Sequence, residues 1–420
     1  MAVKKRKNNS PIAVIGAGPA GLLAAITAAE SGKHVVLYNK NPEPGKKISA
    51  IPPDEFFFSE KLPTRKLASS FSGRGDFVTP IFKAFGHAEL TKFFKKLNIN
   101  IEPDQAGRLR ADGLTGRQLG LTLLDEALKR GVEYKKSSRV TDVLLNHGKI
   151  SGVQVNSSPQ PAAAVILAPG SISAPKHGAT TDGYEISKRL GHRVVEPKPA
   201  LLDFVINEKY GKILSGTTVE EINISIFFNG RQAKSEIGDI KFTPYGVSGP
   251  VILNHSAEII EQLNSTPVEI RLDFMPDEPR ELFETWLIKN FMSRRHLQVG
   301  QFLSRYFEDQ TAKAIEAESR VKLDKSIAHI TNLERKSLVH AIKDFRLTIK
   351  GPRPFNYTRG VLGGVATDEI DPATCESKII KSLYFAGDVL DVLGPWGGYN
   401  MQFAFSSGFV AGNAVGTAAR

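Results

Sequence analysis

The sequence has one cysteine, Cys375, in 420 residues. A single thiol excludes an intrachain disulfide, a CxxC redox pair and a thiolate zinc cluster, and it is typical of a reducing compartment. No apolar run reaches the roughly 18 residues of a membrane-spanning helix, and the N-terminus lacks the apolar core of a secretory leader. His177 and His192 show no metal-ligand spacing, so we predict no metal site. We therefore expect a cytoplasmic protein without membrane association.

Acidic residues are fewer than basic ones, with 44 Asp and Glu against 55 Lys and Arg, and the net charge is +11. This excess favours anionic ligands such as phosphates or nucleic acid without naming one. Four of the charges lie in residues 1–10, which we expect to be a basic disordered tail, either a solvated arm or a nucleic-acid contact. The content of 24% charged and 41% hydrophobic residues excludes wholesale disorder and collagen-like repeats.

A glycine-rich turn follows the first apolar segment. Ile12 to Ile15 reads as a buried strand, Gly16-Ala17-Gly18-Pro19-Ala20-Gly21 is a GxGxxG motif, and a helix-forming segment comes next. In this context the glycines permit a tight turn and close approach of a pyrophosphate, and the helix N-terminus offers free N–H groups. The spacing predicts a Rossmann-type dinucleotide site, and a purely structural turn is the alternative.

The residue expected to hold a ribose is not acidic here. The end of the second predicted strand carries Asn39 where Asp or Glu is usual, so a hydroxyl could be bonded only without the help of a charge. Lys40, Lys46 and Lys47 follow closely. They suit the 2′-phosphate of an NADP-like ligand or, alternatively, are solvated surface residues.

The residue composition and the predicted secondary structure change twice along the chain. Short strand-like segments begin near residue 196, charged helical segments follow up to 345, and a glycine-rich apolar texture returns from 355. We therefore predict an α/β fold in which a dinucleotide-binding domain at 11–195 and 346–420 is interrupted by an insert. The insert, or substrate domain, spans 196–345 and is expected to be β-rich over 196–275 and helical over 276–345.

Several blocks carry a family resemblance. Residues 383–412, which include LYFAGDVLDVLGPWGGYNMQFAFSSGFVAG, and residues 363–378 resemble the C-terminal signature of the HI0933-type flavoproteins, a family of bacterial NAD(P)/FAD-dependent oxidoreductases. Residues 166–192 and 243–253 are similar to two further blocks. The resemblance covers most of the chain outside the helical insert and residues 48–70, and the chain is identified as a divergent member.

The resemblance implies a Rossmann-type FAD-binding domain and a flavin-dependent oxidoreductase. The implied reaction is hydride transfer from reduced flavin to a conjugated C=C of a small-molecule substrate, with NAD(P)H reducing the flavin. A ribosomal RNA dihydrouridine synthase-type flavoenzyme, whose partner would be ribosomal RNA, is one alternative. A degenerate non-enzymatic nucleotide-binding scaffold is another. No oligomeric state is predicted.

The resemblance also implies where the cofactor binds. Gly387-Asp388 closes a strand where a carboxylate can accept hydrogen bonds from ribityl or ribose hydroxyls, although the family usually has Glu there. Gly397 to Gln402 opens the last helix, whose N–H groups can face the flavin, with a packing role as the alternative. Together with the N-terminal motif, the predicted cofactor-binding residues are Gly16, Gly18, Pro19, Ala20, Gly21, Asn39, Lys40, Lys47, Ala168, Gly170, Gly387, Asp388, Gly398, Tyr399, Asn400 and Met401.

One loop departs from the family pattern. After Pro44-Gly45-Lys46-Lys47 the family continues into a glycine-rich Arg-Cys-Asn loop around the flavin, whereas this chain reads ISAIPPDEFFFSEKLPTRKLASS. One possibility is that Arg65, Arg74 or Phe71 replaces the flavin contacts of the missing loop. The alternative is that cofactor binding and activity are altered.

No residue is assigned as the catalytic acid. Tyr399, Tyr245, Asp391 and His255 are polar candidates that are more typical of structural positions, and Cys375 is expected to be a packing residue.

Overall fold

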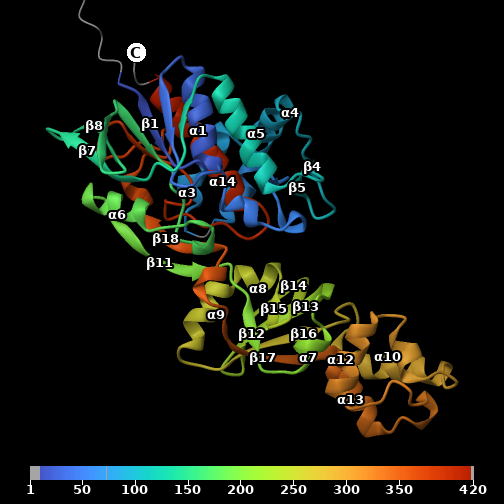
Figure 1. The fold of residues 1–420 in the computed structure, drawn as a ribbon. Coiled ribbons are helices and arrows are strands. Elements are labelled where there is room, and N and C mark those ends of the chain that lie inside the picture. The colour runs from blue at the N-terminus through green and yellow to red at the C-terminus, as the bar shows by residue number, and fades with distance from the viewer. Residues whose placement is uncertain (1–9, 72, 418–420) are drawn as a thin grey trace, which may run out of the picture. The chain divides into compact units, whose positions relative to one another are not determined.

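The chain forms two compact units in the computed structural model, which describes residues 10–71 and 73–417. The first unit comprises Met1–Pro199 and Arg359–Arg420, and the second comprises Ala200–Thr358 (Figure 1). The expected basic tail falls almost wholly on residues 1–9, outside the described residues.

A five-stranded parallel sheet forms the centre of the first unit, in the order β19-β10-β1-β2-β6. Its strands β1, β2 and β10 are buried along their whole length, as expected for a parallel sheet covered on both faces. The predicted Rossmann-type α/β fold is confirmed. The strands are β1 Ile12–Ile15, β2 Val35–Tyr38, β6 Glu133–Lys135, β10 Ala164–Leu167 and β19 Leu383–Phe385.

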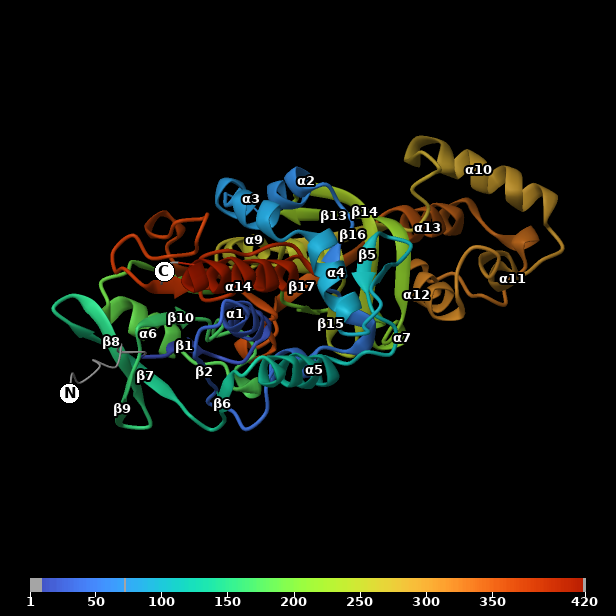
Figure 2. The same ribbon diagram turned by 90° about the horizontal axis from the view of Figure 1, so that it is seen from above.

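Helices pack on this sheet and on one another. Figure 2 shows α14 lying between α1 and α3. Apolar residues at helical spacing in residues 88–97 and 117–130 predict two helices. Both form within one residue of these bounds, as α4 and α5. The helices of this unit are α1 Pro19–Glu30, α2 Thr64–Ser69, α3 Gly75–Ala84, α4 His87–Lys96, α5 Gly116–Lys129, α6 Asp182–Arg189 and α14 Tyr399–Thr417.

Three small sheets complete the first unit. The first, β3-β5-β4, consists of Ser59–Glu60, Arg108–Arg110 and Glu102–Pro103. The second, β7-β8-β9, consists of Val140–Asn146, Lys149–Val155 and Ser158–Pro161, and the third pairs β11 Val194–Ala200 with β18 Gly360–Val365.

The second unit is built on a closed barrel in the order β12-β15-β14-β13-β16-β17. Alternate residues of β16 are buried, as a barrel wall requires. The barrel strands are β12 Phe204–Ile206, β13 Thr218–Phe228, β14 Arg231–Thr243, β15 Gly246–Ser248, β16 Val268–Asp273 and β17 Phe345–Pro352. Its helices are α7 Tyr210–Ile213, α8 Pro250–Asn254, α9 Ser256–Leu263, α10 Arg280–Ser293, α11 Val299–Leu303, α12 Asp309–Ser319 and α13 Asn332–Lys343.

The second junction lies later than the sequence indicated. We placed the return to the first domain at residue 346, but β17 pairs with β16 and β12 and so closes the barrel. The second unit therefore continues to Thr358, whose hydroxyl donates to Ala200 O at 2.6 Å. The barrel needs this sixth strand, which the helical segment before it concealed.

The described part of the chain also forms six short 3₁₀ helices, η1–η6: Ile48–Ala50, Pro53–Glu55, Pro175–His177, Ile327–His329, Phe355–Tyr357 and Thr367–Glu369. Among the helices of residues 10–71 and 73–417, none is long and apolar enough to cross a membrane.

Candidate functional site

The predicted site residues gather at one edge of the central sheet. Because β1, β2, β10 and β19 are parallel, their carboxyl ends share that edge. The segments that follow them carry the glycine motif, Asn39 and Lys40, Ala168 to Gly170, and Gly387 with Asp388. This edge is where ligands bind in open α/β sheets.

The glycines of the N-terminal motif have different tasks. Gly16 has a φ of +103°, and a Cβ there would overlap Ala168 O. A Cβ at Gly21 would overlap Gly16 O. A Cβ at Gly18, by contrast, would meet nothing within 4 Å. Packing therefore requires glycine at the first and third positions, while Gly18 faces open space.

The motif also places a helix N-terminus beside that space. Gly18 is the N-cap of α1 and Pro19 is its first residue, a position where the missing N–H of proline costs no hydrogen bond. Ala20 packs against Gly387 at the end of β19, where a Cβ added to Gly387 would lie 2.9 Å from the Cβ of Ala20. The first turn of α1 thus presents N–H groups and the positive end of its dipole at the sheet edge.

The side chain of Asn39 forms hydrogen bonds that hold the loop after β2. Its Nδ2 donates to Asn41 O at 2.9 Å, Glu43 O at 3.0 Å and the Tyr134 hydroxyl at 3.0 Å. Among the described residues Oδ1 of Asn39 has no hydrogen-bond partner, so only this atom remains to accept from a ligand hydroxyl. Lys40 donates to Thr180 Oγ1 at 2.7 Å, and burial lowers the pKa of its ammonium.

An ion pair spans the sheet edge. Lys47 Nζ lies 2.5 Å from Asp388 Oδ2 and 3.1 Å from Ser173 Oγ. Lys47 follows β2 and Asp388 follows β19, and β1 and β10 lie between these two strands. Oδ1 of Asp388 has no hydrogen-bond partner within residues 10–71 and 73–417. One oxygen of this carboxylate therefore stays available to a ligand.

The third strand end lies directly beneath the glycine turn. Ala168 is buried, and its N–H donates to Ile15 O at 2.9 Å. A Cβ at Gly170 would meet nothing within 4 Å. Ala168 thus supports the turn, and Gly170 borders the same open edge.

The last helix overhangs the first. Gly408 packs against Ala20 and Gly412 against Ala24, so α14 and α1 run parallel. With this register α14 begins about eight residues before the position opposite the start of α1, or roughly 12 Å at 1.5 Å per residue. Two helix N-termini are therefore offset along one direction, an arrangement that suits an extended ligand with two anionic parts.

The start of α14 is held by its neighbours. Gly398, with a φ of +102°, packs against β3, where a Cβ would lie 2.7 Å from Ser59 N. The Tyr399 hydroxyl donates to Glu60, and burial together with this carboxylate raises the pKa of Tyr399. Asn400 exchanges hydrogen bonds with the backbone of Gly394 at 2.8 and 2.9 Å. Met401 is half-buried.

The segment that departs from the family folds onto this helix. Phe57 packs edge-on against Trp396, and the Arg108 guanidinium lies 4.6 Å from the centre of the Phe57 ring. Phe71 is buried against Tyr399, and Arg74 pairs with Asp391, so neither side chain is free to replace the missing loop.

The remaining predicted candidates have structural partners. Asp391 accepts from Gly363 N at 3.0 Å besides its bond to Arg74. His255 lies 2.7 Å from Glu236, and the exposed Tyr245 ring packs against Arg353. Cys375 is fully buried, and burial raises the pKa of its thiol.

The structure assembles one constellation that the sequence did not indicate. His192 Nε2 lies 2.9 Å from Ser377 Oγ, and its Nδ1 lies 2.9 Å from Glu369 Oε2. The His192 side chain is fully buried, and Ser377 Oγ also accepts from Ile379 N and Ile380 N. The hydroxyl is thus saturated and out of reach of a substrate. No local signal links residues 192, 369 and 377, because only the fold brings them together.

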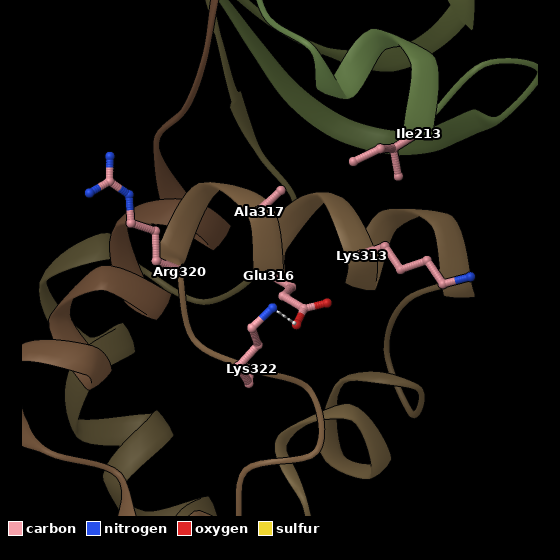
Figure 3. A pocket seen from close by; sticks show the side chains of 6 residues that line it. All are labelled: Ile213, Lys313, Glu316, Ala317, Arg320 and Lys322. Carbon is pink, nitrogen blue, oxygen red and sulfur yellow. Dashed lines mark ion pairs between the residues drawn. The ribbon is translucent and has the colours of Figure 1, made fainter.

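A pocket in the second unit contains none of the predicted residues. It is lined by Ile213 and one side of α12, and Lys322 pairs with Glu316 there at 3.4 Å (Figure 3). Its cations lie on the exposed surface. In residues 10–71 and 73–417, no group of three or more His, Cys, Asp or Glu side chains is arranged to hold a metal.

Comparisons with known proteins place the chain in a family. A family model described as "HI0933-like protein Rossmann domain" matches residues 10–414. The 3-dehydro-bile acid delta(4,6)-reductase of Clostridium scindens is 28% identical over 419 residues, covering 96% of this chain and 98% of that protein. The ribosomal RNA dihydrouridine synthase of Haemophilus influenzae is 29% identical over 422 residues, covering 96% and 97%.

A solved structure shows the same fold. The 3-ketosteroid delta1-dehydrogenase of Sterolibacterium denitrificans aligns with a TM-score of 0.54 at 11% identity, covering 98% of this chain and 100% of that one.

Proposed function

The chain belongs to the HI0933-like protein family, and from that premise we propose that it is an FAD-dependent oxidoreductase. The proposed reaction reduces a conjugated C=C of a substrate, with NAD(P)H as the electron donor. The named relatives are a reductase and a synthase, and the first acts on a bile acid by its name.

One observation carries the cofactor proposal. Of the three glycines in the motif, Gly18 alone could carry a Cβ without meeting another atom within 4 Å, and it caps the N-terminus of α1. A glycine that packing does not require, beside free N–H groups, fits close approach of a pyrophosphate.

Polar groups along the rest of this edge support the proposal. We propose that Oδ1 of Asn39 accepts from the adenosine ribose and that Oδ1 of Asp388 accepts from the ribityl chain. Lys47 orients the Asp388 carboxylate through its other oxygen. Lys40 and Gly170 border the ligand, and Ala168 supports the turn from below.

The N-terminus of α14 would hold the flavin end. A flavin bound here would supply hydride transfer to one carbon of the substrate C=C, and the other carbon would take a proton from solvent or from a side chain. The N–H groups of Tyr399, Asn400 and Met401 and the helix dipole stabilise negative charge at that end. The bonds of Asn400 to Gly394 and of Tyr399 to Glu60 keep this helix start in place.

A second candidate function uses the same chemistry on RNA. The C5=C6 bond of uracil is conjugated with a carbonyl, as the bile-acid double bond is, and a relative that matches 96% of this chain is a ribosomal RNA dihydrouridine synthase. The basic charge of the chain favours this candidate as well.

The absorbance spectrum of the purified full-length protein tests the proposal. We expect a yellow protein whose flavin bands bleach when NADPH or NADH is added without oxygen. Colourless protein that gains no bands with added FAD would contradict it and leave the non-enzymatic scaffold. Flavin bands that neither nicotinamide bleaches would contradict only the proposed electron donor.

A further inference from the structure

The excess positive charge lies in one part of the chain. The second unit, residues 200–358, contains 21 Lys and Arg and 21 Asp and Glu, so it contributes no net charge. The whole net charge of +11 therefore belongs to the first unit. Within it, residues 61–110 contain ten Lys and Arg against four Asp and Glu. This segment covers α2, α3, α4 and the strands β4 and β5.

We propose that part of this segment is a docking surface for the phosphate backbone of RNA. The surface, called the cationic strip here, consists of Lys61, Arg65, Lys83, Lys92, Lys95 and Lys96. The choice of RNA rests on the second candidate function, while the strip itself rests on the geometry and charge described below.

Helix α4 forms the axis of the strip. Lys92, Lys95 and Lys96 have the spacing i, i+3, i+4 and share one exposed face of this helix. At its other end, Lys83 belongs to the last turn of α3, just before Gly86, the N-cap of α4.

The start of α2 joins the strip at the same end. A Cβ at Gly86 would lie 3.9 Å from Thr64 Oγ1, so α2 begins beside the start of α4. Arg65 follows Thr64 directly, and Lys61 lies three residues before Thr64. The cations thus run from the start of α4 to its end.

The charges of the strip are not neutralised by the protein. All six side chains are exposed, and none forms an ion pair with another described residue. Two of the four acids in residues 61–110 have other partners: Glu89 caps α4 through Gly86 N at 3.1 Å, and Asp104 pairs with Arg108 at 2.8 Å. An unpaired row of cations releases counterions when it binds phosphates, which favours a polyanion.

The character of the strip favours nucleic acid over a membrane. A helix that enters a lipid surface exposes aromatic or aliphatic side chains next to its cations. The described part of residues 61–110 has no large exposed hydrophobic side chain, and Leu90 and Phe94 of α4 are buried in the core. The absence of exposed rings also predicts backbone contacts without base stacking.

The strip lies next to the candidate site within the same unit. Lys61 directly follows β3, whose Ser59 packs against Gly398 at the start of α14. A strand held on the cations would therefore lead toward the flavin end of the site, which is where a base must reach.

Binding of a fluorescein-labelled single-stranded RNA of mixed sequence, followed by anisotropy over a salt series, tests the inference. The full-length variant Lys92→Gln/Lys95→Gln/Lys96→Gln removes three charges of the strip. A matched variant, Lys289→Gln/Arg295→Gln/Lys336→Gln, removes three exposed charges of the second unit. We expect the first variant to weaken binding about tenfold at 0.1 M salt and to lower the slope of log K against log salt by about 2. The control should change the affinity less than about twofold, as expected for surface charges outside the interface.

Equal effects of the two variants, or no RNA binding by the wild type at low salt, would overturn the inference. Binding to vesicles with phosphatidylserine that exceeds RNA binding and depends on the strip would replace it with a membrane. Flavin absorbance keeps the two proposals apart, because a wild type that shows flavin bands but binds no RNA at low salt contradicts only the RNA surface. RNA binding by a colourless protein contradicts only the flavin.

Discussion

At the residue scale, Gly18 separates a folding role from a binding role. The same motif contains Gly21, where a Cβ would overlap Gly16 O, and Gly18, where it would meet open space. The sequence motif alone does not distinguish the roles of these two glycines. Their surroundings show that one serves packing and that the other is free for a ligand.

Substitution by alanine tests this difference. Gly18→Ala should leave the thermal stability of the flavin-free protein within about 0.5 kcal/mol of wild type, because the new methyl group meets no atom. It should weaken FAD binding about tenfold or more, because the methyl group enters the space for the pyrophosphate. Gly21→Ala, the matched variant, should lose about 1–3 kcal/mol of stability through overpacking. Thermal unfolding and fluorescence titration with FAD measure both, and equal FAD affinity for Gly18→Ala and wild type would refute the assignment.

His192 is a second residue whose role comes from its surroundings. It joins Ser377 and Glu369 in hydrogen bonds of 2.9 Å, and its ring packs edge-on against Phe385 of β19. Burial lowers the pKa of His192, and this effect outweighs the opposing effect of Glu369. The folded protein thus disfavours the charged form of this histidine more than the unfolded chain does.

The buried histidine predicts an acid-dependent loss of stability. Below about pH 6.5 the unfolded chain binds a proton at His192 more readily than the folded chain does, so the free energy of unfolding falls as the pH falls. The slope from this residue has an upper limit of about 1.4 kcal/mol per pH unit, the value for one full proton. His192→Gln should remove this part of the slope, measured by denaturant unfolding between pH 7.5 and 5. His177→Gln, at the end of the 3₁₀ helix η3, serves as the control and should keep the wild-type slope. Identical profiles for His192→Gln and wild type would contradict this explanation.

At the element scale, the contact between α1 and α14 decides where the flavin end of the site lies. Gly408, Gly412 and Gly416 recur every four residues along α14, and the first two bring its backbone against Ala20 and Ala24. This close approach fixes the overhang of α14 beyond α1. The sequence shows the glycine spacing, but it does not show the partner helix.

A methyl group at this contact should disturb both packing and cofactor binding. A Cβ at Gly408 would overlap Ala20 O, so Gly408→Ala should lose about 1–3 kcal/mol of stability. It should also weaken FAD binding, because α14 shifts relative to α1. Asn413→Ala, an exposed position on the same helix, should leave both unchanged. Chemical denaturation and FAD titration measure the two effects, and a stable Gly408→Ala protein would show that the helices tolerate a wider separation.

At the scale of the whole molecule, the chain has two separate hydrophobic cores. One surrounds the parallel sheet, and the other fills the barrel and its helices. Because Thr358 bonds to Ala200, the second unit starts and ends at one place. The proposed cofactor residues all belong to the first unit.

This division predicts how FAD affects unfolding. Calorimetry should resolve two transitions, since domains with their own cores unfold as units. FAD at 100 times its dissociation constant should stabilise the first unit by about 2.7 kcal/mol and raise only its transition. Fluorescence of Trp286 in a Trp396→Phe variant reports the second unit and should not respond to FAD. A single transition that shifts as a whole would contradict independent unfolding.

The sequence by itself determined the Rossmann-type class, the position of the glycine motif and the helices α4 and α5. These depend on local patterns: an apolar run, a tight turn and a 3.6-residue period. It also indicated the polar residues at strand ends, since parallel strands share one edge. Their ligand contacts stay a prediction.

Only the tertiary structure decided the rest. It kept β17 in the barrel, because a closed barrel needs that strand whatever precedes it in the chain. It also assigned Phe71 and Arg74 to packing and pairing, joined His192 to residues about 180 positions away, and gathered exposed cations along α4. Each of these depends on which surfaces meet, and contacts between distant segments leave no periodic signal in the sequence.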